Sequence, residues 1–454
     1  MSIVSRTRKN VDMRSGNIYS LLITFALPLL LGDLFQQLYN LTDTWVIGNF
    51  ATNAEYSAVG ACSPILKLII KSFIGFSAGT QLVISRSYGQ WNQERVKHGS
   101  STAAVICIVS AVLLTIVGRV ISPYALKITG VPPEIYNYAK DYLDIIFNLV
   151  SAQIIYNMGA GVLRSIGDSQ KPFLFLVAAS VINVILDLYF VIKLGWGIKG
   201  VAWATAIAQC VSAALVIIEL FRTTLWVKID IHDFKFDKDM AKEMIGLGVP
   251  TAIQMGITAL SNVFVQSYVN GLGVDFLSAH STYSKTENLL FLFANSIGIA
   301  TMTFVSQNLG ANQIERARQG VKASMVIIET ITISLGALII LFARPIAIFF
   351  NDEPGVVKYA TYALRFVTPF FLCQCLTQVF INAIRGCGDT KTPMFLQLTF
   401  NIGFRQLVLF LTKKFIAYTP ESVLAAQPLS WMAVFFSLLI AYRRCAIGKN
   451  PKKI

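Results

Sequence analysis

Long apolar runs separated by short polar clusters dominate the pattern of the chain. Typical runs are 104–117 (AVICIVSAVLLTIV) and 177–192 (VAASVINVILDLYFVI). A helix needs roughly 20 mostly apolar residues to cross a bilayer, and the polar clusters mark where such helices end. The pattern predicts about twelve spans, at residues 19–48, 57–84, 100–122, 139–163, 172–194, 199–222, 243–271, 278–305, 321–344, 358–384, 393–416 and 422–443.

Composition agrees with this pattern and narrows the class of protein. The 454 residues are 55% hydrophobic and only 14% charged, which excludes an ordinary soluble enzyme. The first apolar run is too long for a removable signal peptide and lacks a small-residue cleavage site, so we expect it to stay in the membrane. The predicted fold class is an all-α, polytopic membrane protein.

Two segments share the pattern R-x-x-G-D-x-x-x-P: 162–172 (VLRSIGDSQKP) and 383–393 (AIRGCGDTKTP). Each copy alone is typical of a loop between two helices, because glycine ends a helix, aspartate caps the next helix and proline is tolerated in its first turn. The neighbourhoods repeat as well, since 85–99 (SRSYGQWNQERVKHG) matches 306–320 (SQNLGANQIERARQG). The chain therefore contains an internal repeat.

Each repeat holds about six spans, so both copies enter the membrane in the same direction, as in transporters built from parallel repeats. We expect a six-helix lobe at 1–222, a cytoplasmic linker at 223–242 and a second six-helix lobe at 243–454. The alternation of apolar and polar residues at 227–237 also fits a strand, although a solvated linker is favoured.

Basic residues orient the helices. If both termini lie in the cytoplasm, most Lys and Arg residues fall on that side, as the positive-inside rule requires. The net charge of +14 then needs no nucleic-acid partner. We expect an integral protein of the cytoplasmic (plasma) membrane with both termini inside. Terminal residues that support this side are Arg6, Arg8, Lys9, Lys449, Lys452 and Lys453.

Cysteine and histidine give no sign of an enzyme or of a transition-metal site. The 7 cysteines are odd in number and lie mostly in apolar runs, which suits packing. His98, His232 and His280 are scattered among loops and helix ends. We expect no cofactor, no catalytic residues and no metal beyond sodium at a cation site.

Carboxylates inside predicted spans are the strongest functional candidates, because each costs about 2.5–3.5 kcal/mol to insert. Asn183 and Asp187 are spaced i, i+4 and share one face of the fifth helix. Asp43, late in the first helix, and Thr205, early in the sixth, lie at a similar depth. Oxygen ligands of this kind suit sodium, while two nearby carboxylates tend to share a proton. A site of this kind suits either H⁺ or Na⁺.

A substrate cleft is harder to identify. A polar stripe on the first helix, together with flexible or flat side chains elsewhere, fits either a cleft or ordinary packing. The candidates are Asp33, Gln36, Tyr39, Asn40, Asn157, Met158, Gln254, Met255, Glu287 and Phe291. Four basic residues at membrane depth either pair with Asp33 and Glu287 or indicate an anionic substrate: Lys67, Lys71, Lys285 and Arg405.

Pro28 lies inside the cytoplasmic half of the first predicted helix. A proline there removes a backbone hydrogen bond and allows a bend. Asp43 is on the same helix, so bending could couple cation occupancy to the opening of the lobes. Pro28 is therefore a candidate hinge.

The whole chain resembles the MATE (multidrug and toxic compound extrusion) family. The motifs that carry the resemblance are the early ALP (26–28) and GVP (248–250), the run QQLYNLTDTWVIG (36–48), and the repeated ERxxxG and RxxGDxxxP loops. The resemblance implies antiport: a small organic molecule leaves in exchange for protons or sodium through a cleft between two lobes. It implies that Asp43, Asn183, Asp187 and Thr205 form the cation site of the first lobe.

The resemblance also limits the second lobe and leaves an alternative function. Some members carry carboxylates on the seventh and tenth helices, which here have none in their interiors, so no second cation site is expected. The basic residues keep open a lipid-linked sugar or amphipathic anion flippase of the same wider group. A channel is disfavoured, because it needs neither alternating lobes nor buried carboxylates in a paired repeat. The expected partners are the substrate and membrane lipids, with the chain acting as a monomer.

Overall fold

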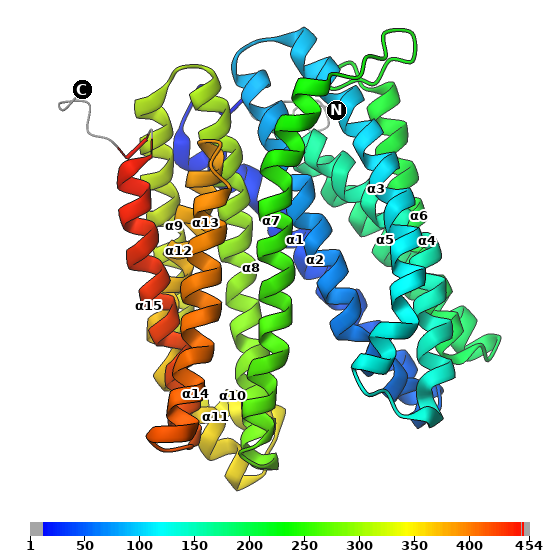
Figure 1. Cartoon of the computed structure of the whole chain (residues 1–454), viewed down its shortest axis with the longest axis vertical. Coiled ribbons are helices and arrows are strands. Elements are labelled where there is room, and N and C mark those ends of the chain that lie inside the picture. Colours follow the sequence, from blue (N-terminus) through cyan, green and yellow to red (C-terminus); the bar gives the residue numbers. More distant parts are fainter. Residues whose placement is uncertain (1–11, 446, 449–454) are drawn as a thin grey trace, which may run out of the picture. The chain divides into compact units, whose positions relative to one another are not determined.

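The computed structural model describes residues 12–445 and 447–448, and within them the chain forms helices and no strand (Figure 1). Twelve helical segments are long and apolar enough to cross a membrane, which confirms the predicted spans. The longer helices are α1 (Ile18–Phe50), α2 (Asn53–Gly89), α3 (Gln93–Ile128), α4 (Pro133–Ser165), α5 (Gln170–Asp187), α6 (Gly197–Arg222), α7 (Lys238–Asn270), α8 (Val274–Gly310), α9 (Ile314–Leu341) and α15 (Pro420–Arg444). The terminal residues Arg6, Arg8, Lys9, Lys449, Lys452 and Lys453 lie outside the described residues.

The remaining elements are shorter and mark breaks within the repeat. The ninth predicted span ends early at Leu341, and a separate helix α10 (Ala343–Phe350) follows. The tenth span comprises α11 (Pro354–Val367), a 3₁₀ turn that contains Pro369, and α12 (Phe371–Gly386). The eleventh comprises α13 (Lys391–Leu396), a π-helical stretch (Gln397–Phe404) and α14 (Arg405–Phe415). Proline lacks a backbone N–H, which explains the break at Pro369.

The chain forms two compact units, one of which contains Leu27–Ala252. The other contains Met13–Ala26 together with the chain from Ile253 onward. The chain therefore passes from one unit to the other inside α1 and again inside α7, rather than at the predicted linker 223–242. Both passages lie next to a proline within the helix, Pro28 in α1 and Pro250 in α7.

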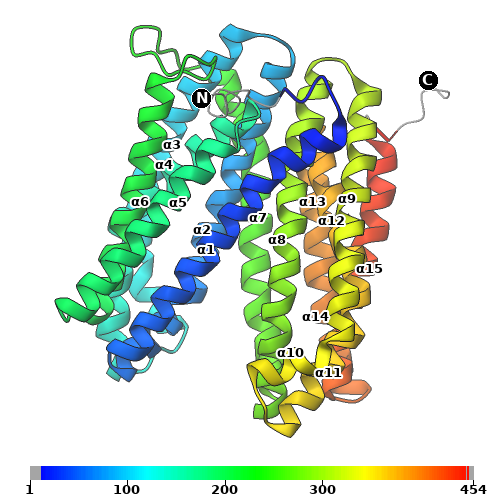
Figure 2. The same cartoon turned by 180° about the vertical axis from the view of Figure 1, so that it is seen from behind.

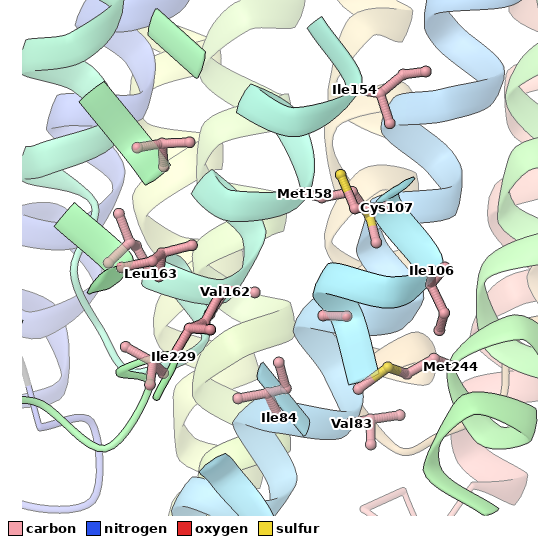
Figure 3. Close-up of a cluster of buried hydrophobic side chains, with 14 of the residues drawn as sticks. Val83, Ile84, Ile106, Cys107, Ile154, Met158, Val162, Leu163, Ile229 and Met244 are labelled. Atoms are coloured by element: carbon pink, nitrogen blue, oxygen red, sulfur yellow. The ribbon is translucent and has the colours of Figure 1, made fainter. Parts of the chain in front are cut away.

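Each unit has a central helix. In the first unit α4 contacts α2, α3 and α6, and α5 packs against α6 (Figure 1). In the second unit α12 contacts α8, α9 and α15 (Figure 2). The largest apolar cluster of the first unit gathers side chains from five helices and the linker, among them Ile84, Ile106, Ile154, Met158, Val162, Ile229 and Met244 (Figure 3).

The linker is a loop that packs on the first unit. The side chain of Val227 is fully buried, and the Ile229 amide donates a hydrogen bond of 2.9 Å to the Leu220 carbonyl at the end of α6. The Asp237 amide donates to the Thr102 hydroxyl at 3.0 Å. Val227 and Ile229 thus insert into the core, whereas the later apolar residues Ile231, Phe234 and Phe236 are exposed. No strand forms at 227–237, so the strand alternative is wrong.

Both R-x-x-G-D-x-x-x-P segments form the same loop, which explains why the pattern occurs twice. Gly167 and Gly388 adopt φ values of +90° and +92°, a region that glycine enters without strain. Asp168 and Asp389 then cap the next helix: each carboxylate accepts a hydrogen bond from the backbone amide three residues later, at 3.1 Å and 2.9 Å. The motif is first a structural device for turning the chain.

The arginines of the two motifs fix these loops to a neighbouring helix. Arg164 donates from Nε to the Gln81 side-chain oxygen at 3.3 Å in the first unit. Arg385 donates from Nη2 to the Gln254 side-chain oxygen at 2.8 Å in the second. The glutamine partners lie on α2 and α7, so the repeat conserves the role of the arginine but not the helix that receives it.

Glycine permits a close contact between α2 and the beginning of α7 within the first unit. A Cβ atom on Gly248 would lie 2.7 Å from the Phe76 carbonyl oxygen, and one on Gly75 would lie 2.7 Å from the Thr251 carbonyl oxygen. The two backbones therefore touch, and any side chain at these positions must push them apart.

We expect Gly248→Ala to destabilise the protein by about 1–3 kcal/mol, because the added methyl overlaps the backbone of α2. Gly246→Ala on the same helix is the matched control, since a Cβ there meets nothing within 4 Å. Thermal unfolding of both variants in detergent would measure the difference. Equal midpoints for the two variants would contradict the contact.

Candidate functional site

The structure brings the four predicted cation residues together in the first unit. Asp43 lies on α1, Asn183 and Asp187 on α5, and Thr205 on α6. The Thr205 hydroxyl donates to Asp43 Oδ2 at 3.5 Å. Asn183 and Asp187 are the other polar groups that interact with the Asp43 carboxylate. The i, i+4 spacing on α5 therefore does direct both of its polar side chains toward α1.

Most oxygen and nitrogen atoms of this cluster are buried without a hydrogen-bond partner. Asn183 and Asp187 are 1% and 0% exposed. Among the described residues, no group bonds to either Asp187 oxygen, to either polar atom of the Asn183 amide, or to Asp43 Oδ1. Buried polar atoms are normally hydrogen-bonded, because an atom that loses its water and gains no hydrogen bond destabilises the folded state. A proton or a cation between the two carboxylates would satisfy these atoms.

A small cavity adjoins these residues. The polar side chains that line it are Tyr39, Ser180, Asn183, Thr205 and Gln209, and the apolar ones are Leu176, Ala179 and Ala208. The Tyr39 hydroxyl accepts a hydrogen bond of 3.3 Å from the Gln36 amide and also interacts with Asp43 and Gln209. The oxygen atoms of these side chains are of the kind that sodium prefers, although most of the cavity wall is apolar and neither Asp43 nor Asp187 is part of it.

Two residues near the site escaped the sequence analysis. Gln209 lies four residues after Thr205 on α6, so the same i, i+4 argument applied to α6 would have found it. Tyr142 comes from α4, is 8% exposed and interacts with Asp43, Tyr39 and Asp187. An isolated tyrosine in an apolar run gives no such signal.

The backbone changes form directly after the site. α5 ends at Asp187, and residues Leu188–Lys193 continue as a π-helical turn. Short π-helical segments are rare and occur frequently at functional sites, because the wider turn changes the direction of the side chains that flank it. Asp187 therefore lies at the junction where the helix changes its pitch.

A family model with the description MatE matches residues 28–189 and again residues 250–411. The chain belongs to the MatE (MATE) family. The two matched stretches correspond to the two repeats found in the sequence, and this MATE protein is accordingly an integral membrane transporter. The resemblance drawn from the motifs is confirmed.

Three comparisons place this MATE chain among its relatives. It is 26% identical to the "Probable multidrug resistance protein YoeA" of Bacillus subtilis, over 92% of this chain and 91% of the relative. It is 23% identical to the "Probable multidrug resistance protein NorM" of Thermotoga maritima, over 82% and 81% of the two chains. A solved structure titled "Outward-facing conformation of a multidrug resistance MATE family transporter of the MOP superfamily" matches with a TM-score of 0.91 at 21% identity, covering 98% of this chain and 100% of that one.

The candidate cleft residues have more varied surroundings in the structure. Met158 is 3% exposed and lies in the apolar core of the first unit, against the Thr80 hydroxyl (Figure 3). Packing, rather than substrate contact, accounts for Met158. Gln254 is 7% exposed and accepts the hydrogen bond from Arg385 described above, so it too has a structural role.

The other cleft candidates remain accessible to different degrees. Asp33, Asn157, Met255 and Phe291 are half-buried, and Asn40 is exposed. The Asn157 amide donates to the Gln153 carbonyl at 2.8 Å, and both residues line a second small cavity of the first unit. Substrate contact stays a prediction for these five.

Glu287 belongs to a polar network of the second unit. Gln427 on α15 donates to Glu287 Oε1 at 2.7 Å and accepts from Arg405 Nη2 at 3.1 Å. The predicted pairing of Arg405 with Glu287 is therefore indirect, with an amide bridging the two charges. Lys285 lies elsewhere, with its ammonium 5.1 Å from the centre of the Phe350 ring.

No carboxylate cluster like that of the first unit accompanies this network. Among the described residues, no group of three or more His, Cys, Asp or Glu side chains is arranged to hold a metal ion. The same holds for Asp43 and Asp187, so the first unit is favoured by its buried, unpaired carboxylate oxygens rather than by the number of its acidic groups.

We expect Na⁺ or low pH to raise the thermal stability of the purified transporter, because an ion that binds only the folded state stabilises it by about 2.7 kcal/mol at a hundredfold excess over Kd. Asp43→Asn and Asp187→Asn should each lose this response. The Na⁺ and pH series, run separately, identify the ion.

Asp141→Asn is the control, since Asp141 is an exposed carboxylate that pairs with Lys199 at 3.0 Å. It should retain the wild-type shift in the unfolding temperature. A full shift in Asp187→Asn would show that the stabilising ion binds somewhere else.

Proposed function

We propose that this MATE transporter is a secondary antiporter that exports small organic compounds in exchange for H⁺ or Na⁺. The observation that supports it best is the cluster of buried, unpaired oxygen atoms of Asp43 and Asp187 beside a small cavity. In the proposed setting the chain is a monomer in the cytoplasmic membrane, with both termini inside and no cofactor other than the coupling ion.

The proposed coupling rests on electrostatics. Two ionised carboxylates close together in an apolar region repel each other and are costly to keep dehydrated. A bound proton or Na⁺ reduces the charge of Asp43 and Asp187, so α1, α5 and α6 can close around the site. Release of the ion on the cytoplasmic side restores the charge and reopens the helices. The ion favours one arrangement of the helices and the substrate favours the other, so the two compete without contacting each other.

Replacing Asp43 or Asp187 by Asn should abolish gradient-driven export while substrate still binds. We expect the two single variants to be about as impaired as the double variant, with export reduced roughly tenfold or more, because residues that act as one unit are not additive. Drug efflux from cells and equilibrium binding to purified protein would measure the two effects separately.

Thr205→Val is a milder change to the same four-residue cluster, because it keeps the shape of the side chain and removes only the hydroxyl that donates to Asp43. We expect weaker ion dependence and retained export. If either single Asn variant exports against a gradient at the wild-type rate, the cluster is not the coupling site, and Asp33 and Glu287 become the next candidates.

Pro28 is the proposed hinge in α1. It lies two residues beyond Ala26, where the helix passes from one compact unit to the other, and Asp43 follows on the same helix. Pro28→Ala restores a backbone N–H that can form the missing helical hydrogen bond. We expect this variant to slow transport severalfold while its ion and substrate affinities change little.

Pro123→Ala is the matched control, since Pro123 lies inside α3 and within a single unit. It should leave the transport rate near that of the wild type. Full transport activity in Pro28→Ala would remove Pro28 from the mechanism. The measurement is initial efflux rate in proteoliposomes under a fixed ion gradient.

A lipid-linked sugar or amphipathic anion flippase is the second candidate function. The exposed basic residues Lys67 and Lys71 in the middle of α2 are the observation that favours it. Export of a water-soluble dye that depends on an imposed Na⁺ or pH gradient would support the antiporter. Transfer of a labelled lipid between leaflets that needs no such gradient would support the flippase.

A further inference from the structure

One face of α2 is open in the first unit and carries two lysines. Gly60, Pro64, Lys67 and Lys71 follow one another at intervals of three or four residues, so they share a face of the helix. All four are exposed, and a Cβ atom added to Gly60 would meet nothing within 4 Å. Further along α2 the same side closes at Gly75, against the beginning of α7.

The depth of these lysines excludes an ordinary surface role. Lys71 is the central residue of α2, which runs from Asn53 to Gly89. At about 1.5 Å per residue it lies roughly 27 Å from either end of the helix. A lysine side chain can extend toward the membrane surface only from near a helix end. Lys67 and Lys71 must therefore meet water, a counter-charge or a ligand within the depth of the membrane.

The counter-charge available in the first unit is too small. Asp33 on α1 and Lys67 are the charged groups whose fields act on Lys71. Asp33 also acts on Arg164, so this one carboxylate is shared between Lys71 and Arg164 while Lys67 adds a further positive charge. The open face of α2 therefore carries an excess of positive charge where the membrane provides no counter-ions.

We propose that Lys67 and Lys71 bind the anionic group, a carboxylate or phosphate, of an amphipathic organic substrate. The inference rests on the proposed transport function, since it names the class of compound that this protein carries. Side chains at i and i+4 have Cβ atoms about 5–6 Å apart, so two ammonium groups can converge on one oxyanion. Charge-assisted hydrogen bonds of this kind are about twice as strong as neutral ones.

The remaining features of the face suit such a ligand. Gly60 and Pro64 leave space beside the lysines for the organic part of the molecule. Asp33 limits the affinity by competing for Lys71, which lets the substrate leave. A cationic compound, in contrast, would meet repulsion from both lysines. The face therefore selects by the sign of the charge.

The test is equilibrium binding to the purified full-length protein in neutral detergent, measured by fluorescence anisotropy with carboxyfluorescein and 4-methylumbelliferyl phosphate. These probes represent the carboxylate and the phosphate, and ethidium is the cationic comparison. Lys67→Gln with Lys71→Gln should weaken binding of an anionic probe by roughly tenfold or more. Lys67→Arg with Lys71→Arg should retain it.

Two further variants separate charge recognition from loss of structure. Asp33→Asn removes the competing carboxylate, so anion binding should become severalfold tighter. Lys228→Gln with Lys242→Gln removes the same charge from exposed positions of the first unit and should change nothing. A gain in Asp33→Asn cannot come from a damaged fold.

The proposal is overturned if neither anionic probe binds the wild-type protein, or if the double Gln variant binds them as well as the wild type. Competition by phosphatidylglycerol in nanodiscs assigns the anionic group to a lipid headgroup, and its absence assigns it to a free compound; either outcome supports recognition of an anion. Binding needs no ion gradient, so failure of the Asp43 and Asp187 coupling would leave this result unchanged.

Discussion

Two carboxylates buried in a helical core with only one hydrogen bond between them and the surrounding side chains that the structure describes are the constraint on which the first unit depends. Asp187 is completely buried and Asp43 retains one bond, to Thr205. An apolar side chain at either position would avoid the free-energy cost of burying a carboxylate, so the presence of two carboxylates indicates a functional role. The small side chains of Ala179 and Ala208 leave room for the cavity that Asn183 and Thr205 line.

The same constraint explains why the helices are arranged as they are. α5 and α6 pack against each other and present Asn183 and Thr205 to α1. α1 is also one of the two helices that pass between the compact units. A change of charge at Asp43 therefore acts on a helix that belongs to both units. The second such helix, α7, contacts α2 through backbone at Gly248, which leaves it little freedom to slide.

Local spacing allowed the spans and the shared face of Asn183 and Asp187 to be predicted, whereas the inclusion of Asp43 and Thr205 depends on their similar depth and on the resemblance to the MATE family. Apolar runs of sufficient length determine the helices, and Asn183 and Asp187 share a face by helical periodicity alone. The passage of α1 and α7 between units could not be predicted, since it depends on contacts between distant segments. Met158 shows the same limit: its flexible side chain suits a cleft or a core equally well, and only the surrounding helices decide.

Arg405 lies on the helix of the second repeat that corresponds to the helix of Asn183, and Gln427 lies on the one that corresponds to the helix of Thr205. In the second unit a guanidinium, bridged by Gln427 to Glu287, supplies a permanent positive charge, whereas in the proposed mechanism the first unit takes its positive charge from solution. A tethered cation cannot dissociate, so in that mechanism Arg405 would contribute no ion to the exchange. An antiporter of this design would exchange only the ions held at Asp43 and Asp187, and the steepest concentration ratio it could maintain for an uncharged compound would be set by the electrochemical gradient of those ions alone.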